Sequence, residues 1–423
     1  MGLGKTFVGS QKMNALDNRV NLVICQKSKI KDWLEHFETY YRWYNSRVQN
    51  DIYDLTDAEQ FCLFTHSANT KTLGMVIGVI NYELAWRRKD LLSLKDFTLM
   101  LDESSLIQND TAKQSKFVLK LNATNVILLS GTPTSGKYEN LWSQSKLLGW
   151  DISKALYNNH YINWKQLEVF DGSSMRTRTV KVVDKQNPYK NVERLKNKLR
   201  EHGAVFMKTD EVMGLPEQNF IDVFVPKAKE YDRFQEESIV EIGDKTLVGD
   251  TSLTKLLYSR QLCGIYSREK LQAYKDMLGG TSDRLIVFYN FTDEVKLLIQ
   301  ATNESGRPWG IISGEHKILA PYENDDDSVL FVQYQSGSMG LNLQKANKII
   351  YYSLPIRSEL FEQSKKRIHR IGQQRACFYY VMKCRGTVEE GIHDTLNQLR
   401  DYTDELFREG DSLSRLRKTS RTK

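Results

Sequence analysis

Three adjacent residues near the start of the chain, Gly4-Lys5-Thr6, have the types and order that end a phosphate-binding loop, G-x-x-x-x-G-K-[ST]. Apolar residues follow with helical spacing, which predicts that the loop opens a helix (Phe7, Val8, Met13 and Leu16). Backbone N–H groups and the dipole at a helix N-terminus attract phosphate. In this interpretation Lys5 reaches the β- and γ-phosphates, and the Thr6 hydroxyl binds a metal ion. A chance G-K-T with an exposed lysine is the competing interpretation.

Two adjacent carboxylates, Asp102-Glu103, follow the apolar run Leu99-Met100-Leu101. Ligands of open α/β folds bind at the carboxyl ends of parallel strands, so we expect this pair at a ligand-binding edge. In phosphoryl-transfer sites an acid at this place holds Mg²⁺, and its neighbour polarises a water molecule. An acidic pair after a strand is more often a solvated turn, but its occurrence downstream of Gly4-Lys5-Thr6 favours the catalytic interpretation.

The basic stretch at 363–373 contains Arg367 and Arg370, three residues apart. This spacing predicts that both side chains share one helix face, and two guanidinium groups on one face suit multidentate contact with phosphate. A solvated, charged helix is the plainer alternative. His369, between the two arginines, is more readily structural than catalytic. The stretch Ser130-Gly131-Thr132-Pro133 is either a strand-to-turn exit or a hydroxyl-rich loop beside the γ-phosphate.

Parallel strands are needed to position these residues, and short apolar runs indicate where the strands lie. In the first half, the runs are at 20–25, 75–80, 97–101 and 126–129. The first run is followed by a stretch with one apolar helical face (Ile30, Trp33, Leu34, Phe37 and Tyr41). In the second half, the runs are at 285–289, 311–312, 329–332, 349–352 and 378–382, and a last helix extends from Val388 to Leu406. This alternation predicts two parallel α/β sheets.

Between the two sheets, positions 150–215 are polar and basic, and apolar strand runs disappear. We expect a helical insertion with a solvated basic surface there, followed by a linking strand at 220–225. The predicted fold class is α/β, with two parallel-sheet lobes and a helical insertion between them. The expected segments are 1–148 (first lobe), 149–215 (helical basic insertion), 216–280 (linker and helical segment), 281–408 (second lobe) and 409–423 (basic tail).

The composition fits a soluble globular protein and argues against several other classes. Lys plus Arg number 60 against 53 acidic residues, a net charge of +7 that permits nucleic acid without requiring it. The five cysteines are scattered and odd in number, which argues against a disulfide framework and a zinc site. No apolar run approaches the ~18 residues of a membrane helix, so we expect an intracellular protein that does not use a membrane.

Seven short stretches occur in order over nearly the whole chain. They are Gly2-Leu3-Gly4-Lys5-Thr6, Asn81-Tyr82-Glu83, Asp102-Glu103, Ser130-Gly131-Thr132-Pro133 with Asn140-Leu141-Trp142, Arg260-Gln261-Leu262-Cys263, Gly340-Leu341-Asn342-Leu343 and His369-Arg370-Ile371-Gly372-Gln373. Together they resemble the motifs of the Swi/Snf-type ATPases, double-stranded DNA translocases of helicase superfamily two. One such match is weak evidence, whereas the ordered set is specific, and its H-R-I-G-Q stretch most of all.

The resemblance implies two RecA-like lobes and a site for ATP and Mg²⁺. Lys5 and Thr6 would bind phosphate and the metal ion, Asp102 would hold Mg²⁺, and Glu103 would activate the attacking water. Arg367 and Arg370 would contact the γ-phosphate from the second lobe. The other residues that the resemblance assigns to the nucleotide are Gly2, Gly4, Gly340 and Gln373.

The resemblance also implies that double-stranded DNA is gripped by loops that follow the strands. The contacts would go mainly to phosphates, so binding would be independent of sequence and sensitive to salt. The residues implied are Lys27, Ser28, Asn81, Tyr82, Asn290, Ser336 and Ser338.

The chain departs from the family pattern in several places. Asp102-Glu103-Ser104-Ser105 stands where Asp-Glu-Ala-His is common, and Thr134-Ser135-Gly136-Lys137 replaces the usual Leu-Gln-Asn run. Met1 matches the methionine of E-M-G-L-G-K-T, so we expect the first lobe to be incomplete at its N-terminus, without the strand that feeds the loop and the glutamine that reads adenine. The compact build resembles bacteriophage or mobile-element members, which suggests the cytoplasm of a bacterial or phage-infected cell, or the nucleus in a eukaryote.

The function expected from these features is an ATP-dependent DNA translocase that couples hydrolysis to movement along duplex DNA and remodels protein–DNA complexes. Replication or recombination proteins are further expected partners. Three alternatives stay open: a catalytically impaired DNA-binding fragment of such an enzyme, an RNA helicase of the same superfamily, and an interaction scaffold that uses the basic middle segment.

Overall fold

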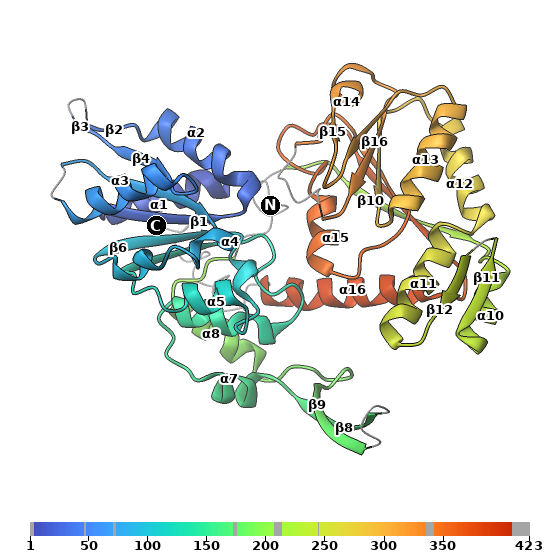
Figure 1. Cartoon of the computed structure of the whole chain (residues 1–423), viewed down its shortest axis with the longest axis horizontal. Coiled ribbons are helices and arrows are strands. Elements are labelled where there is room, and N and C mark those ends of the chain that lie inside the picture. Colours follow the sequence, from blue (N-terminus) through green and yellow to red (C-terminus); the bar gives the residue numbers. More distant parts are fainter. Residues whose placement is uncertain are drawn as a thin grey trace, which may run out of the picture. The chain divides into compact units, whose positions relative to one another are not determined.

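The structure is a computed structural model, which describes residues 4–45, 48–70, 73–171, 176–206, 214–243, 245–335 and 342–407. The chain divides into two compact units (Figure 1). We call them the N-terminal unit, which contains the described residues from 4 to 206 and 401–407, and the C-terminal unit, which contains those from 214 to 400. Each unit is built around its own mainly parallel sheet.

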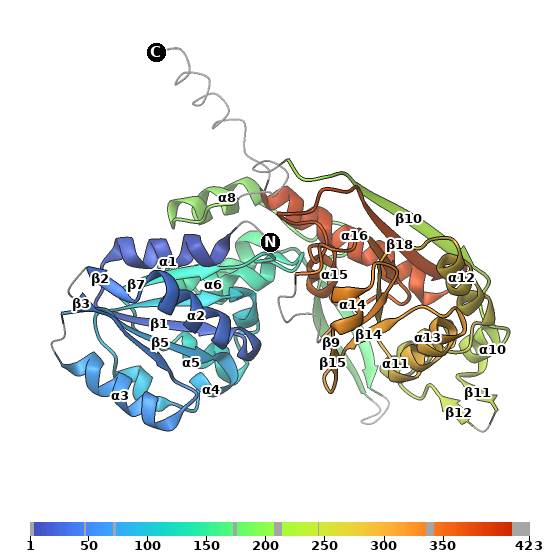
Figure 2. The same ribbon diagram turned by 90° about the horizontal axis from the view of Figure 1, so that it is seen from above.

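The N-terminal unit has a five-stranded parallel sheet in the order β4-β5-β1-β6-β7. Its strands are β1 (Val20–Cys25), β4 (Asp51–Asp54), β5 (Val76–Asn81), β6 (Phe97–Asp102) and β7 (Asn125–Leu129). Figure 2 shows α1 (Lys5–Leu16) on one side of this sheet and α3 (Ala58–Asn69) and α5 (Lys113–Val118) on the other. Because helices cover both faces, β1 and β5 are buried along their whole length, which explains their continuous apolar runs.

Two apolar clusters make the core of this unit, one on each face of the sheet. Helix α2 (Ile30–Tyr40) packs beside α1 through Trp33 and Phe37, which contact Met13 and the inner faces of β1 and β5. The opposite cluster contains Phe61 and Phe64 of α3 and residues of α4 (Tyr82–Ala85) and α5. The four strands predicted in this half are confirmed. Strand β4 escaped prediction because it is half-buried and has an aspartate at each end.

The insertion after β7 is not purely helical. It contains α7 (Lys154–Tyr161), an antiparallel hairpin of β8 (Trp164–Asp171) and β9 (Arg176–Val183), and α8 (Val192–Glu201). The helices were expected, but the expectation that strands are absent is wrong. In this ribbon, polar residues interrupt both strands without a regular alternation, so no apolar run marks it, and its basic residues resemble those of a solvated helix.

The C-terminal unit has a seven-stranded sheet in the order β10-β18-β17-β13-β16-β14-β15. Its strands are β10 (Gln218–Val225), β13 (Leu285–Tyr289), β14 (Trp309–Ile312), β15 (Lys317–Ile318), β16 (Val329–Gln333), β17 (Lys348–Tyr351) and β18 (Cys377–Cys384). All pairs are parallel except β14 with β15. The five strands predicted here are confirmed. The expected linking strand, β10, is an edge strand that pairs with β18 along its whole length.

Helices cover both faces of this second sheet. One face carries α14 (Ala320–Asn324), α15 (Ser358–Lys365) and α16 (Val388–Phe407), and the other carries α12 (Arg268–Gly279) and α13 (Thr292–Glu304). A satellite cluster joins α10 (Glu230–Glu237), the hairpin β11 (Ile239–Ile242) with β12 (Lys245–Val248), and α11 (Ser252–Gly264).

The remaining elements are short. They are α6 (Trp142–Leu147), β2 (Trp43–Asn45), β3 (Val48–Gln49) and the 3-10 turns η1 (Lys27–Lys29), η2 (Lys89–Ser93), η3 (Ser104–Ile107) and η4 (Tyr138–Leu141). Within the described ranges, no helix is both long enough and apolar enough to cross a lipid bilayer.

Candidate nucleotide site and candidate nucleic-acid groove

The start of α1 and the end of β6 bring a lysine and two acids together in the N-terminal unit. Lys5 Nζ lies 2.8 Å from Glu103 Oε1, and both side chains are partly buried. Gly4, directly before α1, has φ +69°, and a Cβ built there meets no atom within 4 Å. Glycine adopts this left-handed conformation without steric cost. No atom of the described residues therefore crowds the position of this Cβ.

Asp102 is held by two aromatic residues. Trp33 Nε1 donates to Asp102 Oδ2 at 3.0 Å, and the Tyr82 hydroxyl donates to the backbone oxygen of Asp102 at 2.9 Å. Burial raises the pKa of Asp102, while the ammonium of Lys5 and the N–H of Trp33 oppose that rise. The carboxylate is thus desolvated and oriented by a neighbour, which is the arrangement found around acids that bind divalent cations.

Glu103 is strained and incompletely hydrogen-bonded. Its φ is +53°, in the left-handed region, which costs a residue with a Cβ roughly 1–2 kcal/mol. Its Oε2 atom is buried and has no hydrogen-bond partner among the described residues. A strained carboxylate with an unsatisfied oxygen is expected to take a further hydrogen-bonding group, such as a water molecule.

The loop that follows β7 is clamped by glutamine side chains. The Pro133 carbonyl accepts a hydrogen bond from Gln108 Nε2 at 3.0 Å and another from Gln144 Nε2 at 2.7 Å. Thr132 Oγ1 is buried without a hydrogen-bond partner in the described part of the chain. The loop therefore holds a hydroxyl group on a fixed backbone, which favours the hydroxyl-loop interpretation over a plain turn.

The residues present fit a magnesium-bound nucleotide. A lysine, two carboxylates with an unsatisfied oxygen, and a hydroxyl in the first turn of a helix are the groups that phosphate and Mg²⁺ use in proteins. Thr6 is half-buried in the first turn of α1. Gly2 and Gly340, also predicted to lie near the nucleotide, are outside the described residues.

Arg367 and Arg370, which were predicted to contact the γ-phosphate from one helix face, do not share a helix face. That expectation is wrong. Helix α15 ends at Lys365, and Arg367 and Arg370 lie on the turns that follow. Beyond Lys365 the helical hydrogen bonds give way to turns: Arg367 N donates to the Ser364 carbonyl at 3.1 Å, and the Arg367 carbonyl accepts from Leu343 N at 3.1 Å.

Arg370 is the more available of the two cations. Arg367 is buried, whereas Arg370 is half-buried, and no hydrogen bond or ion pair involves its guanidinium group within the described ranges. Burial lowers the pKa of Arg370. A partly desolvated guanidinium without an anionic neighbour is suited to a phosphate supplied from outside this segment.

Two further residues of this turn hold its shape. Gln373 Nε2 donates to the Ala346 carbonyl at 2.8 Å, and Gln373 Oε1 accepts from the backbone N–H of Arg375 at 3.1 Å. His369 is buried, and its Nε2 lies 2.9 Å from the carbonyl of Pro216, just before β10. The contact with Pro216 supports the structural interpretation of His369. The two hydrogen bonds of Gln373 give that residue a structural role as well.

A groove of about 870 Å³ lies at the carboxyl ends of β1, β4 and β5 in the N-terminal unit. Its polar lining residues are Lys27, Lys31, Asp54, Thr56, Asn81, Glu83 and Arg87, and its apolar ones are Ile30, Leu34 and Leu84. Lys31 and Arg87 are exposed. The three cations outnumber the two carboxylates, Asp54 and Glu83, so the lining keeps a positive excess that is suited to phosphate groups.

The structure brings together some of the predicted DNA-binding residues and not others. Lys27 and Asn81 line the groove. Tyr82 is 1% exposed, so its expected direct contact with DNA is wrong, and its hydroxyl instead supports Asp102. Asn290 lies in the C-terminal unit, where its Nδ2 donates to Ser353 Oγ at 2.8 Å. Ser28 is in η1 beside Lys27, and Ser336 and Ser338 are outside the described residues.

Comparison with known families decides the classification. A family model described as the SNF2-related domain matches residues 1–263, and a second, described as the helicase conserved C-terminal domain, matches residues 269–372. The chain belongs to the SNF2 family. The first match includes Lys5, Asp102 and Glu103 of the nucleotide site, and the second includes Arg367 and Arg370 and ends at Gly372.

Individual relatives of this SNF2 chain are distant. It is 25% identical to a putative ATP-dependent helicase/translocase YwqA of Bacillus subtilis, over 75% of this chain and 36% of that protein. It is 23% identical to the mouse SWI/SNF-related matrix-associated actin-dependent regulator of chromatin subfamily A member 1, over 93% of this chain and 39% of that protein. The chain thus spans less than half the length of these relatives.

Among solved structures, the SNF2 chain is similar to the Sulfolobus solfataricus SWI2/SNF2 ATPase core in complex with double-stranded DNA. The identity is 19% and the TM-score is 0.40, over 98% of this chain and 88% of that one.

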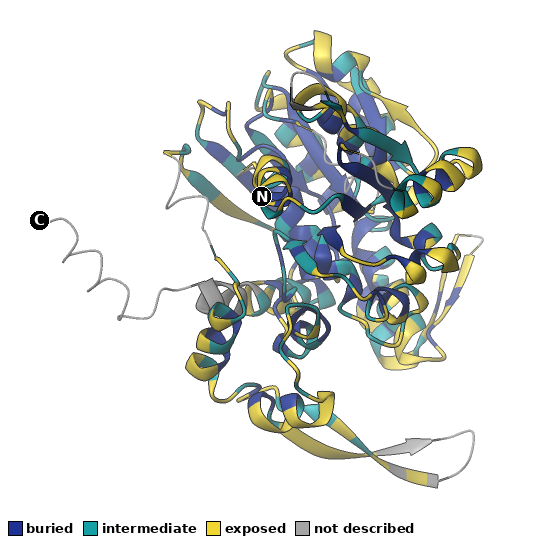
Figure 3. Ribbon diagram, turned by 90° about the vertical axis from the view of Figure 1, so that its left-hand side faces the viewer, coloured by how far each residue is buried: buried dark blue, intermediate teal, exposed yellow. Residues whose placement is uncertain are grey.

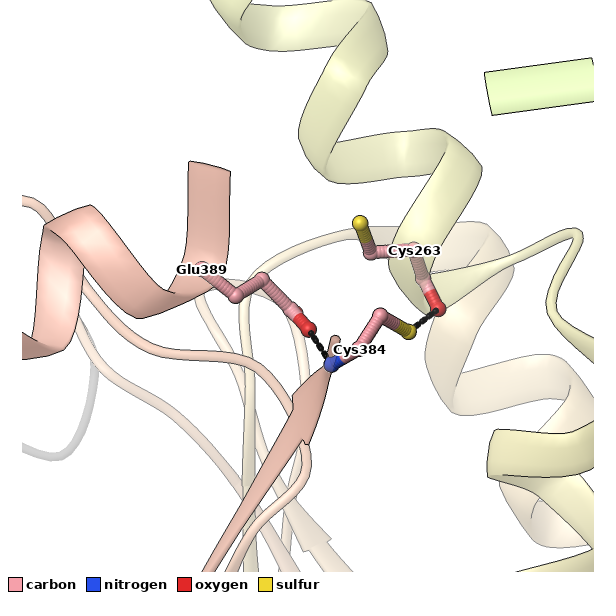
Figure 4. Close-up of side chains that lie close together, drawn as sticks. All are labelled: Cys263, Cys384 and Glu389. Atoms are coloured by element: carbon pink, nitrogen blue, oxygen red, sulfur yellow. Dashed lines mark hydrogen bonds between the residues drawn. The ribbon is translucent and has the colours of Figure 1, made fainter. Parts of the chain in front are cut away.

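The C-terminal unit of the SNF2 chain also gathers three groups that can bind metals. Figure 4 shows Cys263 from α11 and Cys384 from the end of β18 beside Glu389 of α16, and their ligand atoms lie within 4.8 Å of one another. Glu389 Oε1 is 2.5 Å from Lys270 Nζ, and Glu389 Oε2 accepts from Cys384 N at 2.9 Å. Because Lys270 already supplies the positive charge and both carboxylate oxygens are engaged, the cluster is a buried ion pair that joins three elements.

Sequence reasoning missed four residues of the two candidate sites. Trp33 was assigned only to an apolar helix face, although its indole N–H binds Asp102. Lys31, Thr56 and Arg87 of the groove belong to no motif. The only available signal was the spacing of Lys27 and Lys31, four residues apart at the start of a predicted helix.

Proposed function

We propose that this SNF2 chain is the motor core of an ATP-dependent translocase, which hydrolyses ATP and moves along duplex DNA. The observation that carries the proposal is the hydrogen bond of 2.9 Å from Tyr82 to the backbone of Asp102. Tyr82 directly follows Asn81, which lines the groove. One backbone segment therefore borders the candidate DNA surface and supports the candidate metal-binding acid, which gives a direct physical link between the two.

The nucleotide site supports hydrolysis through the residues of the chain itself. Lys5 exchanges its contact with Glu103 for contact with the β- and γ-phosphates. Thr6 and Asp102 would hold Mg²⁺, which when bound would supply positive charge beside the phosphate oxygens. Glu103, once released from Lys5, keeps two oxygens available to orient the attacking water and to accept its proton.

Arg370 is proposed as the cation that stabilises negative charge on the γ-phosphate, with Arg367 as its neighbour. Arg370 is the better candidate because its guanidinium group has no anionic partner within the described residues, and burial lowers its pKa. A cation that is already partly desolvated loses less hydration when it meets phosphate, so more of the electrostatic attraction remains.

The groove supports a contact with DNA that is independent of sequence. Lys27, Lys31 and Arg87 offer their charges to phosphate oxygens, while Thr56 Oγ1 and Asn81 Nδ2 donate to Asp54 and Glu83 of the same lining. Each phosphate neutralised releases counterions, so binding weakens steeply as salt increases. A chain that moves along DNA needs this kind of contact, because every step presents the same backbone and a different base.

The names of the relatives agree with this proposal, since one is a putative ATP-dependent helicase/translocase and another is a regulator of chromatin. We extend the proposal to the remodelling of protein–DNA complexes, with replication or recombination proteins as partners, in the cytoplasm of a bacterial or phage-infected cell or in a eukaryotic nucleus.

The test is ATP hydrolysis by the chain with and without duplex DNA. We expect hydrolysis that requires Mg²⁺ and rises when duplex DNA is added, and that is lost in Glu103→Gln. The groove variant Lys27→Gln/Lys31→Gln/Arg87→Gln should need more DNA for half-maximal stimulation. Displacement of a third strand from a DNA triplex, which reports movement along the duplex, should require ATP.

The same measurements separate the alternatives. DNA binding without any hydrolysis would identify a catalytically impaired DNA-binding fragment. Stimulation by RNA but not by DNA would identify an RNA helicase. If neither nucleic acid binds, while a protein partner binds through Arg194 and Lys198 of the basic insertion, the chain would be an interaction scaffold. Each of these results would overturn the proposed function.

A further inference from the structure

The hairpin of β8 and β9 stands apart from the sheet of the N-terminal unit. It forms a two-stranded sheet of its own, with eight residue pairs in unbroken register from Trp164↔Val183 to Asp171↔Arg176. At about 3.4 Å per residue, such a ribbon is roughly 27 Å long. Figure 3 shows that the described part of the ribbon consists of exposed and intermediate residues, with none that is buried.

The base of the ribbon is firmly attached. Asn163 N donates to the Pro188 carbonyl at 2.9 Å, and Asp184 N donates to the Asn163 carbonyl at 2.9 Å. The Tyr189 ring stacks on the buried Tyr138 ring, with centroids 4.2 Å apart. Tyr138 begins η4, shortly after the clamped loop that follows β7. The ribbon is therefore an arm whose base is fixed to the segment that follows the loop after β7.

The arm carries an excess of positive charge. Residues 164–190 include six basic side chains (Lys165, Arg176, Arg178, Lys181, Lys185 and Lys190) and three acidic ones (Glu168, Asp171 and Asp184). One acid is already neutralised, because Asp184 Oδ1 lies 2.9 Å from Lys165 Nζ, and this hydrogen bond lowers the pKa of Asp184. The side chains of Lys181 and Lys185 are exposed and take part in no ion pair in the described part of the chain.

The rest of the exposed surface also favours a nucleic acid. Thr177, Thr179 and Lys181 share one face of the ribbon, which therefore presents two hydroxyl groups and an ammonium group, with Glu168 opposite Thr179. Hydroxyl and ammonium groups are typical donors to phosphate. A lone two-stranded ribbon is marginally stable in water, so a polyanion that binds it also stabilises it. The ribbon has a width that the major groove of duplex DNA accepts.

We propose that the β8–β9 arm is a second contact with duplex DNA, which grips the sugar–phosphate backbone separately from the groove at the sheet edge. The proposal rests on the proposed function in one respect, that duplex DNA is the substrate. Because the arm is fixed near the loop after β7, DNA held by it is tied to the same rigid unit as the nucleotide site.

The test is the salt dependence of DNA binding by the full chain. In the arm variant Lys181→Gln/Lys185→Gln/Lys190→Gln, three charges are lost from exposed positions. The slope of log K against log[salt] should fall by about 2.7, since each phosphate contact contributes about 0.9. Between 50 and 200 mM salt, the wild-type chain should thus lose about 40-fold more affinity than the arm variant loses.

The control variant Lys95→Gln/Lys116→Gln/Lys120→Gln removes the same charge from exposed positions of the same unit and should keep the wild-type slope. Thermal unfolding of each variant shows that the chain is folded. If the arm variant keeps the wild-type slope of log K against log[salt], the proposal is overturned. The arm would then be a candidate surface for a protein partner. A wild-type chain that fails to bind DNA would instead overturn the proposed function, so the two failures are distinguishable.

Discussion

Replacement of Trp33 by phenylalanine tests whether the indole N–H tunes Asp102 for magnesium. The substitution keeps an aromatic ring that can stack on Phe37 but removes the hydrogen bond of 3.0 Å to Asp102 Oδ2. A hydrogen bond to a charged group contributes roughly 1.5–3 kcal/mol, and loss of a residue that hydrogen-bonds to a metal ligand typically weakens metal affinity about 10- to 100-fold. We therefore expect the Mg²⁺ concentration for half-maximal ATP hydrolysis to rise by about 10- to 100-fold.

The pH dependence of the same variant supplies a second readout. Burial raises the pKa of Asp102, and the N–H of Trp33 opposes that rise. Without this N–H, the pKa of Asp102 rises further, and protons compete with Mg²⁺ up to a higher pH. The acidic limb of the activity profile should therefore shift to higher pH, and excess Mg²⁺ should partly restore activity.

The matched control is Trp142→Phe, which removes an indole N–H bonded to the Ile152 carbonyl at 2.9 Å, away from the two acids. Thermal unfolding of both variants separates a general loss of stability from the effect on the metal. If Trp33→Phe needs no more Mg²⁺ than Trp142→Phe does, the assignment of Asp102 as an indole-supported metal ligand is refuted.

Three further outcomes are expected. Gly264→Ala should destabilise the C-terminal unit by about 1–3 kcal/mol in urea unfolding, because its Cβ would lie 1.9 Å from Glu294 Oε1. Gly391→Ala, in α16 with no atom within 4 Å of its Cβ, should be neutral or stabilising, and equal losses in the two variants would contradict this packing. Arg370→Ala should lower kcat for ATP hydrolysis about 10³- to 10⁵-fold with little change in nucleotide affinity. A decrease in kcat of less than tenfold would exclude Arg370 as the cation that stabilises the γ-phosphate. A hydrogen bond from Lys348 lowers the pKa of Asp283 in the folded protein. The interaction stabilises the folded state at pH values above the pKa that Asp283 has in the unfolded chain. This stabilisation is lost as the pH falls through the lower pKa of the folded state. Asp283→Asn should therefore reduce the acid sensitivity of unfolding, and an unchanged acid limb would count against this ion pair.

The strands and the motif order could be predicted because their signals are local. In a sheet covered by helices on both faces, a strand such as β1 or β13 is apolar along its whole length and is recognisable from a few adjacent residues. The position of Asp102 and Glu103 at a sheet edge follows from the same run. The half-buried β4 and the exposed β8–β9 arm lack this signal, because neither packs two faces into a core.

The amino-acid sequence by itself determined which groups this protein has for chemistry: a lysine at a helix start, two carboxylates after a strand, and two arginines near the end, in the order of one family. The tertiary structure alone decided what those groups contact. Trp33 reaches Asp102 across 69 residues of sequence, Tyr82 is turned into the core, and the arginines lie on a turn where a helix ends. Side-chain spacing specifies contacts only within one element, whereas contacts between elements depend on how the sheet and helices pack together.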